Sequence, residues 1–491
     1  MAMKSLSQSV PTLASWALPR RVAALGSLSV AFMAGCAGFG PNHPQLATTT
    51  PMALDLNKAG TTAVVPRWWT SLNDPQLDRL MDQALQGNPT LAVARSRLDR
   101  AGALADISRA TAGPQANLAA EVTRQRYTEN GLFPRPIAGS VRDNATLQGN
   151  FNWSPDLFGG HAAEIASALD QARAAQADVA TAASTLAAQV GRGYVALARL
   201  LAQREVAERA LGQRDEALSL TRQRTSAGLD SQVELTQAEG ALPDARTQIE
   251  ALNEQIALAR RQIAVLTGQA PNALDDLSPT LARLTLDNMP VALGADLLGR
   301  RPDVVAARWR VEAATQDVAL ARSQFYPNIS LTAFIGFNAL GLGNLMEAGS
   351  RQYGITPALR LPIFDGGRLR AQLGGRQADL DLAIAQYNGI LLDAVKEAGD
   401  AIASGQSLER QQSLQAASLA SAEKAYGFTV QRYRAGLSGY LVVLNTESQL
   451  LAQRRLAVDL RARQLDTRVA LMKALGGGWT DDTASLSVAG H

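Results

Sequence analysis

The chain has little of the side-chain chemistry that most enzymes use. Its 491 residues include one cysteine, and its three histidines, His43, His161 and His491, are widely scattered. No H-E-x-x-H, G-x-S-x-G or P-loop pattern occurs, so the sequence indicates neither a zinc protease, nor a serine hydrolase, nor a nucleotide-binding site. A single cysteine also excludes an internal disulfide. The sequence therefore predicts a protein that is not an enzyme and uses no cofactor or metal.

Charge of one sign is also lacking. The chain has 47 basic and 44 acidic residues, well interspersed, with a net charge of +3. There is no basic block and no interleaving of basic with aromatic residues, so nucleic acid is not a predicted partner. Carboxylates flanked by basic residues on helix faces are typical of solvated surface.

Aromatic residues make up only 5% of the chain, and alanine is abundant. Small side chains let helices pack closely over long distances, as in coiled coils. No proline occurs from Arg368 to Arg434, and good helix formers dominate this stretch. A continuous helix there would be about 100 Å long. After a turn at Ala435-Gly436-Leu437 the chain runs back to Leu475. Apolar residues at three- and four-residue steps predict a buried stripe on this return helix: Leu441, Leu444, Leu451, Leu456, Leu460, Leu465, Val469 and Met472.

The same arrangement occurs earlier in the chain. R-x-x-A-G-L starts at Arg224 and again at Arg432, a shift of 208 residues. P-x-x-x-G-G occurs at residues 155–160 and 362–367, before each long helical stretch. We therefore predict an internal two-fold repeat. Pro243 lies in the first return helix and is expected to bend or break it.

An apolar run from Val22 to Gly35 follows three basic residues and is about 14 residues long. This length fits the h-region of a secretory signal peptide and is too short to span a bilayer. Met33-Ala34-Gly35-Cys36 resembles a bacterial lipobox, in which the cysteine is lipidated, by palmitate among others, and becomes the first residue. A plain signal peptide with a chance cysteine is the alternative.

The repeat and the lipobox together predict the organisation of the chain. The expected parts are a lipoprotein signal peptide at 1–35, a lipidated arm at 36–66, repeat 1 at 67–268 with a helical hairpin at about 160–267, a linker at 269–290, repeat 2 at 291–479 with a hairpin at about 367–476, and a flexible tail at 480–491.

Each repeat also contains two segments in which apolar and polar residues alternate with period two. They predict strands at about 115–127, 143–153, 328–338 and 351–361. About eleven of the 24 aromatic residues lie in or beside these segments. Alternating strands of about ten residues with aromatic flanks are typical of a membrane β-barrel. A soluble, half-buried sheet is the alternative.

Four strands cannot close a barrel, because bacterial single-chain barrels have at least about eight. In lipid, an open edge would leave backbone groups unpaired at a cost of several kcal/mol each. If these strands lie in a membrane, several chains must therefore share one barrel. This argument does not fix the number of chains.

The doubled hairpin and several motifs resemble outer membrane factors of the NodT/OprM type, relatives of TolC. The motifs are the two P-x-x-x-G-G boundaries, residues 300–304 (RRPDV), residues 325–327 (FYP) and residues 475–479 (LGGGW), and the resemblance covers about residues 65–480. It implies a mainly α fold with a membrane β-barrel part. In that fold a homotrimer forms a 12-stranded barrel among outer membrane lipids and a 12-helix α-barrel across the periplasm, and each subunit is lipid-anchored.

The resemblance also implies a function. Outer membrane factors are the exit ducts of tripartite efflux pumps, which pass drugs or other small molecules out of the cell. The expected partners are a periplasmic adaptor and an inner-membrane transporter of RND or major-facilitator type. A periplasmic coiled-coil structural or adaptor lipoprotein without its own pore is the alternative. Such adaptors usually have one hairpin, whereas this chain has two.

Two sets of site residues follow from the resemblance. The turns Ala227-Gly228-Leu229 and Ala435-Gly436-Leu437 correspond to the periplasmic tips, where adaptors of this family dock. Leucine there would offer an exposed apolar contact. The alternative is that the two turns only end their helices.

The second set corresponds to the gate at the periplasmic end. The gate tyrosine of the family falls at Tyr433, and its carboxylate partner on the neighbouring hairpin falls at Glu234. Leu441 corresponds to the constriction, and Asn445 stands where the family has an aspartate one turn later. Ser438 and Val442 also replace charged residues of the family. We expect a weaker cation preference at this gate. Ordinary coiled-coil packing is the alternative role for these residues.

Overall fold

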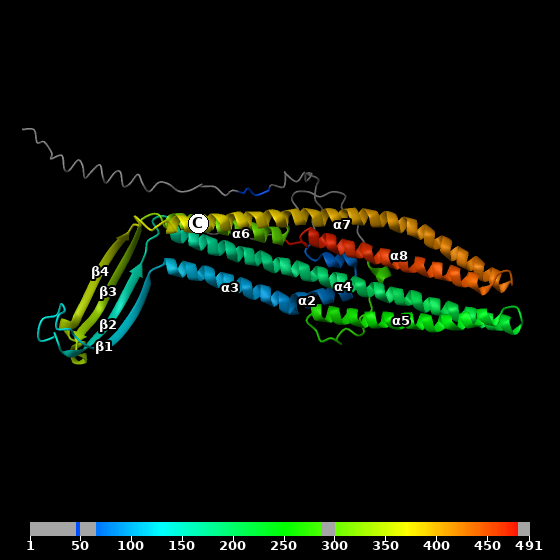
Figure 1. Cartoon of the computed structure of the whole chain (residues 1–491), viewed down its shortest axis with the longest axis horizontal. Helices are drawn as coiled ribbons and strands as arrows, with labels where there is room; N and C mark the ends of the chain where they lie inside the picture. Colours follow the sequence, from blue (N-terminus) through cyan, green and yellow to red (C-terminus); the bar gives the residue numbers. More distant parts are fainter. Residues whose placement is uncertain (1–45, 50–64, 286–299, 480–491) are drawn as a thin grey trace, which may run out of the picture.

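The computed structural model describes residues 46–49, 65–285 and 300–479. The predicted signal peptide, Cys36, most of the arm, residues 286–290 of the linker and the tail lie outside the described residues. The molecule is elongated, with a sheet at one end of a long helical body. At the other end lie two turns, each joining a pair of helices (Figure 1).

Two very long helices run through the helical body. They are α4 (Gly160–Ser226) and α7 (Arg368–Arg434), of 67 residues each, and they are followed by α5 (Gln232–Leu266) and α8 (Tyr440–Ala474), of 35 residues each. The continuous helix predicted from Arg368 to Arg434 is confirmed. The equal lengths are what an internal repeat requires, although the repeat itself remains a prediction.

Among the described residues, three shorter α-helices complete the body: α2 (Pro75–Gly87), α3 (Pro89–Ala112) and α6 (Pro302–Ser323). Each has a proline at its start. The first N–H groups of a helix make no hydrogen bond within it, so proline, which has no N–H, costs none there. None of the described helices combines the length and the apolar character needed to cross a membrane.

Pro243 was expected to bend or break its helix, and it does not break it, because α5 continues through it. A proline removes only one backbone hydrogen bond of a helix, and packing can offset this loss. Ala238, Ala241, Leu242 and Ala245, on either side of Pro243, are all buried. This packing holds together the turns of α5 that precede and follow Pro243.

Two joints connect the short helices to the ends of the return helices. Asn88, just before α3, donates its side-chain Nδ2 to the carbonyl oxygen of Leu266 at 2.8 Å. Arg301, just before α6, donates Nη1 to the carbonyl oxygen of Ala474 at 3.3 Å. Each joint therefore satisfies a carbonyl that the end of a helix leaves free.

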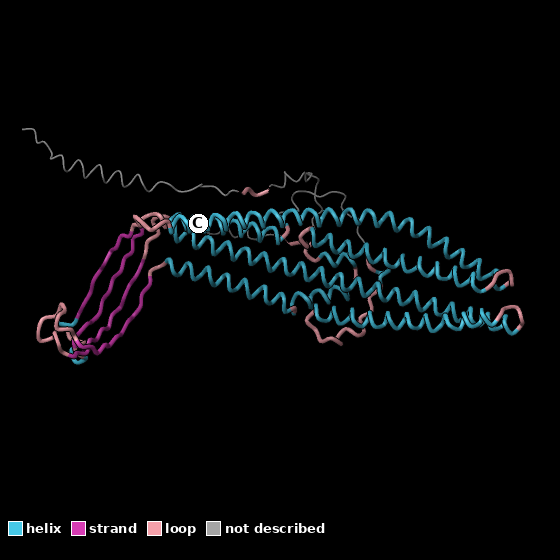
Figure 2. Tube along the Cα trace, viewed as in Figure 1, coloured by secondary structure: helices cyan, strands magenta, loops and turns pink. Residues whose placement is uncertain are grey.

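One antiparallel sheet contains all four predicted strands, in the order β1-β2-β3-β4. The strands are β1 (Gln115–Arg126), β2 (Val141–Trp153), β3 (Asn328–Leu340) and β4 (Arg351–Arg360) (Figure 2). β2 from the first half of the chain pairs with β3 from the second half, with Phe151 opposite Ala333. Within the described residues, β1 and β4 are the edge strands.

The two faces of the sheet differ in chemistry. On one face, apolar side chains are exposed, with Ile335 71% and Tyr353 83% accessible. The other face carries amides and hydroxyls that bond to one another; Gln352 Nε2 donates to Gln148 Oε1 at 2.8 Å, and Asn338 Nδ2 to Thr146 Oγ1 at 2.8 Å. Period-two alternation produces this separation.

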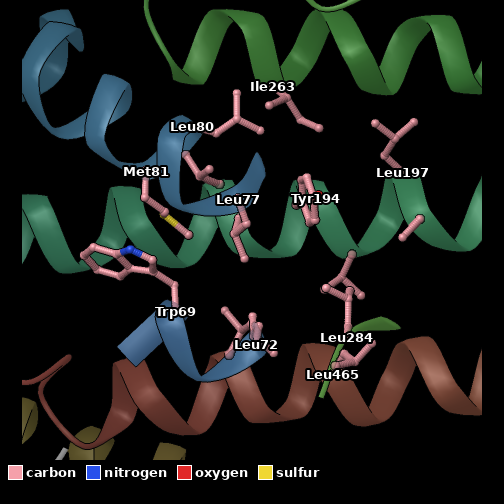
Figure 3. Packing of buried hydrophobic residues seen from close by; sticks show 14 of the residues in the cluster. Trp69, Leu72, Leu77, Leu80, Met81, Tyr194, Leu197, Ile263, Leu284 and Leu465 are labelled. Atoms are coloured by element: carbon pink, nitrogen blue, oxygen red, sulfur yellow. The ribbon is translucent and has the colours of Figure 1, made fainter. Parts of the chain in front are cut away.

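The main hydrophobic core lies midway along the body, where α2, α4, α5 and α8 meet (Figure 3). Tyr194 of α4 is fully buried there, and its hydroxyl donates to Asp74 Oδ2 at 2.7 Å. Asp74 is the N-cap of α2 and accepts from Gln76 N at 2.9 Å. The core therefore fixes the start of α2 against the long helix.

The predicted buried stripe of α8 is only partly correct. Leu460, Leu465, Val469 and Met472 are buried, but Leu441 and Leu456 are exposed. Toward the tip, the buried face of α8 instead contains Val443, Glu447 and Leu450. These three residues have the four- and three-residue spacing of a helix face. The leucine pattern missed this face because one of its members is a carboxylate.

Candidate functional site

The two turns that join helices at the far end of the body, α4 to α5 and α7 to α8, have the same backbone structure. In the first, Leu229 N donates to Arg224 O at 2.8 Å and Gly228 N to Thr225 O at 3.0 Å. In the second, the corresponding bonds are Leu437 N to Arg432 O and Gly436 N to Tyr433 O, at 2.8 and 3.0 Å. This pair of bonds defines the Schellman motif.

Glycine is required in both turns because Gly228 and Gly436 have φ values of +74° and +75°. The leucine that follows each glycine is exposed, with Leu229 66% and Leu437 68% accessible. In a Schellman motif this residue usually packs against the last turn of its helix. Here it leaves an apolar side chain facing solvent at each tip, beside Ala227 and Ala435.

Tyr433 lies in the last turn of α7 and is only 1% exposed. Its ring packs among Leu218, Leu242, Tyr440 and Val443, which come from both hairpins. The guanidinium carbon of Arg224 lies 4.7 Å from the ring centroid, in cation–π contact. The tyrosine is therefore enclosed by residues of both hairpins.

Polar groups of the first hairpin also bind Tyr433. Its hydroxyl donates to Asp230 Oδ2 at 2.6 Å and lies 2.8 Å from Thr221 Oγ1. Arg224 donates Nε and Nη2 to the two oxygens of Asp230 at 2.9 and 3.0 Å, and Nη1 to the backbone oxygen of Tyr433 at 3.0 Å. We call Thr221, Arg224, Asp230 and Tyr433 the tip cluster.

The tip cluster shifts the proton equilibria of its members. The hydrogen bonds from Arg224 lower the pKa of Asp230, and the hydroxyl of Tyr433 adds to this effect. Burial, followed by the bond to the Asp230 carboxylate, raises the pKa of Tyr433 to about 12. At neutral pH the cluster therefore contains a carboxylate, a guanidinium and a neutral phenol, whose bonds are mutually compatible.

The structure does not bring Glu234 to Tyr433 within the chain, so the predicted pairing is corrected. Ser231 is the N-cap of α5, and Glu234 accepts a hydrogen bond from Ser231 N at 2.9 Å in a capping box. The hydrogen bonds from Ser231 lower the pKa of Glu234. The carboxylate partner of Tyr433 is instead Asp230.

The other two predicted gate residues lie on α8. Leu441 and Asn445 are one turn apart and both are exposed, as is Val442. They lie outside the tip cluster and bind none of its members. The structure therefore separates the predicted gate residues into a buried tyrosine, a capping carboxylate and an exposed pair.

Three members of the tip cluster were not predicted from the sequence. A signal for Asp230 was present, because the first tip continues R-x-x-A-G-L with aspartate and the second continues it with Ser438. This difference between two otherwise matching turns indicates that Asp230 has a role that Ser438 does not have in the second hairpin. Arg224 is the arginine that begins the first motif.

Comparison with known proteins places these features in a family. The model of the outer membrane efflux protein family matches residues 80–269 and 293–477, one segment in each half of the chain. Together these segments cover more than half of the sequence. The chain belongs to the outer membrane efflux protein family.

Particular relatives are similar over most of the chain. Fusaric acid resistance protein FusA of Burkholderia cepacia is 39% identical over 372 residues, which are 72% of this chain and 69% of FusA. Multidrug resistance outer membrane protein MdtP of Escherichia coli K12 is 30% identical over 466 residues, covering 92% of this chain and 95% of MdtP. The crystal structure of the outer membrane protein VceC from Vibrio cholerae has a TM-score of 0.81 and 34% identity, covering 85% of this chain and all of VceC.

The family confirms the class of protein that the sequence predicts. The chain is an outer membrane efflux channel, mainly helical with a four-stranded sheet, and not an enzyme or a periplasmic adaptor. At the level of the family, such channels are trimers that work with adaptor proteins and inner-membrane transporters.

Proposed function

We propose that the tip cluster holds the periplasmic end of this efflux channel closed until an adaptor docks on the two tips. In this proposal Tyr433 of the second hairpin is released from Asp230 and Arg224 of the first, and the hairpins then move apart. Leu441 and Asn445 line the constriction, where three asparagines carry no charge.

The tip cluster is the observation that supports this proposal. Its bonds cross from α7 to the end of α4 and to the turn before α5, so they oppose separation of the two hairpins. A bidentate arginine–carboxylate pair has stricter geometry than a single ion pair. Arg224 and Asp230 are also largely shielded from water, with side chains 11% and 5% exposed. Such a pair is weakened little by salt.

The remaining parts of the system follow the relatives. We propose that Leu229 and Leu437 contact the adaptor, that the transporter is of RND or major-facilitator type, and that Cys36 carries the lipid anchor. The names of FusA and MdtP refer to fusaric acid and to multidrug resistance. We therefore propose small toxic molecules as the cargo.

Single-channel recording tests the closed state. Replacing Tyr433 by Phe and Asp230 by Ala removes the bond from the tyrosine hydroxyl to the carboxylate and the ion pair with Arg224, so the conductance in planar bilayers should rise several-fold while heat-stable trimers persist. Glu234→Ala is the matched control. It removes a carboxylate four residues from Asp230 but should cost only about 1 kcal/mol of helix stability and leave the conductance unchanged. An unchanged conductance in the double variant would contradict the proposal.

A further inference from the structure

One aromatic residue interrupts the polar face of the sheet. Along β3, Ser330, Thr332 and Asn338 share a face with Phe334, because alternate residues of a strand point to the same side. Phe334 pairs with Asn150 on β2 and with Gly354 on β4. Ile335, the next residue, lies on the exposed apolar face. Phe334 is therefore the aromatic side chain of an otherwise amide- and hydroxyl-rich surface.

The ring of Phe334 lies against the sheet, over Gly354. A Cβ atom at residue 354 would be 2.6 Å from Phe334 Cε1 and 2.8 Å from Cζ, so any side chain there would displace the ring. This pairing of an aromatic ring with a cross-strand glycine keeps the ring close to the backbone. Phe334 thus forms part of the wall and leaves the space above it open.

Amides border the ring on one side. Gln352 donates to Gln148, and Gln148 donates in turn to Asn150, the cross-strand partner of Phe334. These bonds hold the three side chains along the wall. The result is a flat apolar surface beside a row of hydrogen-bonding groups.

A planar aromatic molecule matches this surface. Aromatic rings gain about 0.5–1.5 kcal/mol from stacked or edge contacts beyond their buried area. This energy is small enough for a passing molecule to leave again, as conduction requires. Neighbouring amides can bond to polar groups on the edge of such a molecule.

We propose that Phe334 lines the pore of the barrel and is a cargo-contacting residue that favours planar aromatic molecules. This inference rests on the proposed function, because the strands of an outer membrane channel turn their apolar face to lipid and their polar face to the water-filled pore. In a trimer, three copies of Phe334 lie at one level of the pore.

Cysteine labelling tests which face carries Phe334. Cys36 is the only natural cysteine and is the same in both variants, so F334C and I335C differ only in where each adds its one new thiol. In trimers reconstituted in lipid vesicles, a charged, water-soluble methanethiosulfonate should label residue 334 at least about tenfold faster than residue 335. The reverse order would overturn the proposal.

Block of the channel current tests the contact itself. Ethidium, a planar aromatic cation, is added to the barrel side of wild-type trimers in a planar bilayer. F334L keeps an apolar side chain but removes the ring, and it should weaken the block about fivefold, the size of one lost aromatic contact. F337L, on the opposite face of the same strand, should leave the block unchanged.

The outcomes separate the two proposals. Trimers that conduct and are blocked equally with and without the Phe334 ring overturn this inference and leave the proposed function intact. Trimers that conduct no ions in any variant overturn the proposed function, and this inference with it.

Discussion

Protonation of two side chains decides whether the tip cluster can form. Asp230 has a lowered pKa, so its contribution to stability is present above the ordinary value of about 3.9 and is lost as the pH falls through the lower, folded value. Tyr433 has its pKa raised to about 12, so its contribution is complete below about 10 and is lost as the pH rises toward 12. The cluster is therefore intact over the whole neutral range.

We predict that the conductance of the wild-type channel is constant from about pH 5 to pH 9 and rises between about pH 10 and pH 12. A phenolate cannot donate to Asp230 and is repelled by its charge. Y433F lacks the titrating hydroxyl, so its higher conductance should change little over the same alkaline range. Equal alkaline increases in both proteins, measured in planar bilayers, would assign the effect to other groups.

At this scale the sequence indicated the tyrosine that the structure buries between the two hairpins, but not the carboxylate that this tyrosine bonds within the chain. Tyr433 was identified through a resemblance, which assigns residues by matching positions in the sequence. It does not show which side chains touch in this chain. Glu234 follows Ser231 by three residues, which is the capping-box pattern and predicts a local partner. Asp230 is in the connecting turn, and only the packing of α7 against the first hairpin brings it to Tyr433.

A buried ion pair connects the long helix of the first hairpin to the return helix of the second. Arg214 Nε of α4 donates to Glu447 Oε1 of α8 at 2.9 Å, and Arg214 Nη1 donates to Ala241 O of α5 at 3.0 Å. The two side chains are 10% and 6% exposed. Burial raises the pKa of Glu447, because the carboxylate loses water there.

We predict that E447A destabilises the channel by about 3–5 kcal/mol, since it leaves Arg214 buried without a counter-charge. The repeat provides the matched control, because Glu239 is the counterpart of Glu447. Glu239 pairs with Arg222 on the surface, and E239A should cost at most about 1 kcal/mol. Denaturant unfolding of detergent-solubilised protein, followed by its helical signal, compares the two. Similar losses in both variants would contradict the role of burial.

The elements themselves were predictable where one composition or one period persists. The stretch without proline gave α7, and strict alternation gave the four strands. The face that α8 buries toward the tip was not predictable, because Glu447 takes a place that a hydrophobic pattern assigns to leucine. Pro243 does not break α5 for a related reason. Packing offsets the hydrogen bond that the proline removes, and sequence periodicity does not measure that packing.

At the scale of the whole molecule, the sheet and the helical tips lie at opposite ends (Figure 1). The sequence predicted that the strands need other chains, because four strands leave two edges. The number of chains came from the resemblance alone. The sequence of one chain contains no feature from which the number of subunits can be read.

We predict that L437D abolishes crosslinking to the adaptor while the trimer persists, because a carboxylate replaces the exposed apolar side chain at the tip. L132D is the control, since Leu132 is fully exposed in the loop between β1 and β2, at the opposite end. It should crosslink like the wild type. Normal crosslinking of L437D would exclude this tip as a docking surface.

The central pairing of β2 with β3 has a consequence for how the protein is made. Each helical hairpin is built from contacts that are near in sequence, and such structure forms early. The sheet must wait for β3, which is synthesised only after the whole first hairpin. A lone β1–β2 ribbon is marginally stable at best in water. We therefore expect newly exported chains to acquire their rod-like part first, and to complete their share of the pore as the final step of biogenesis.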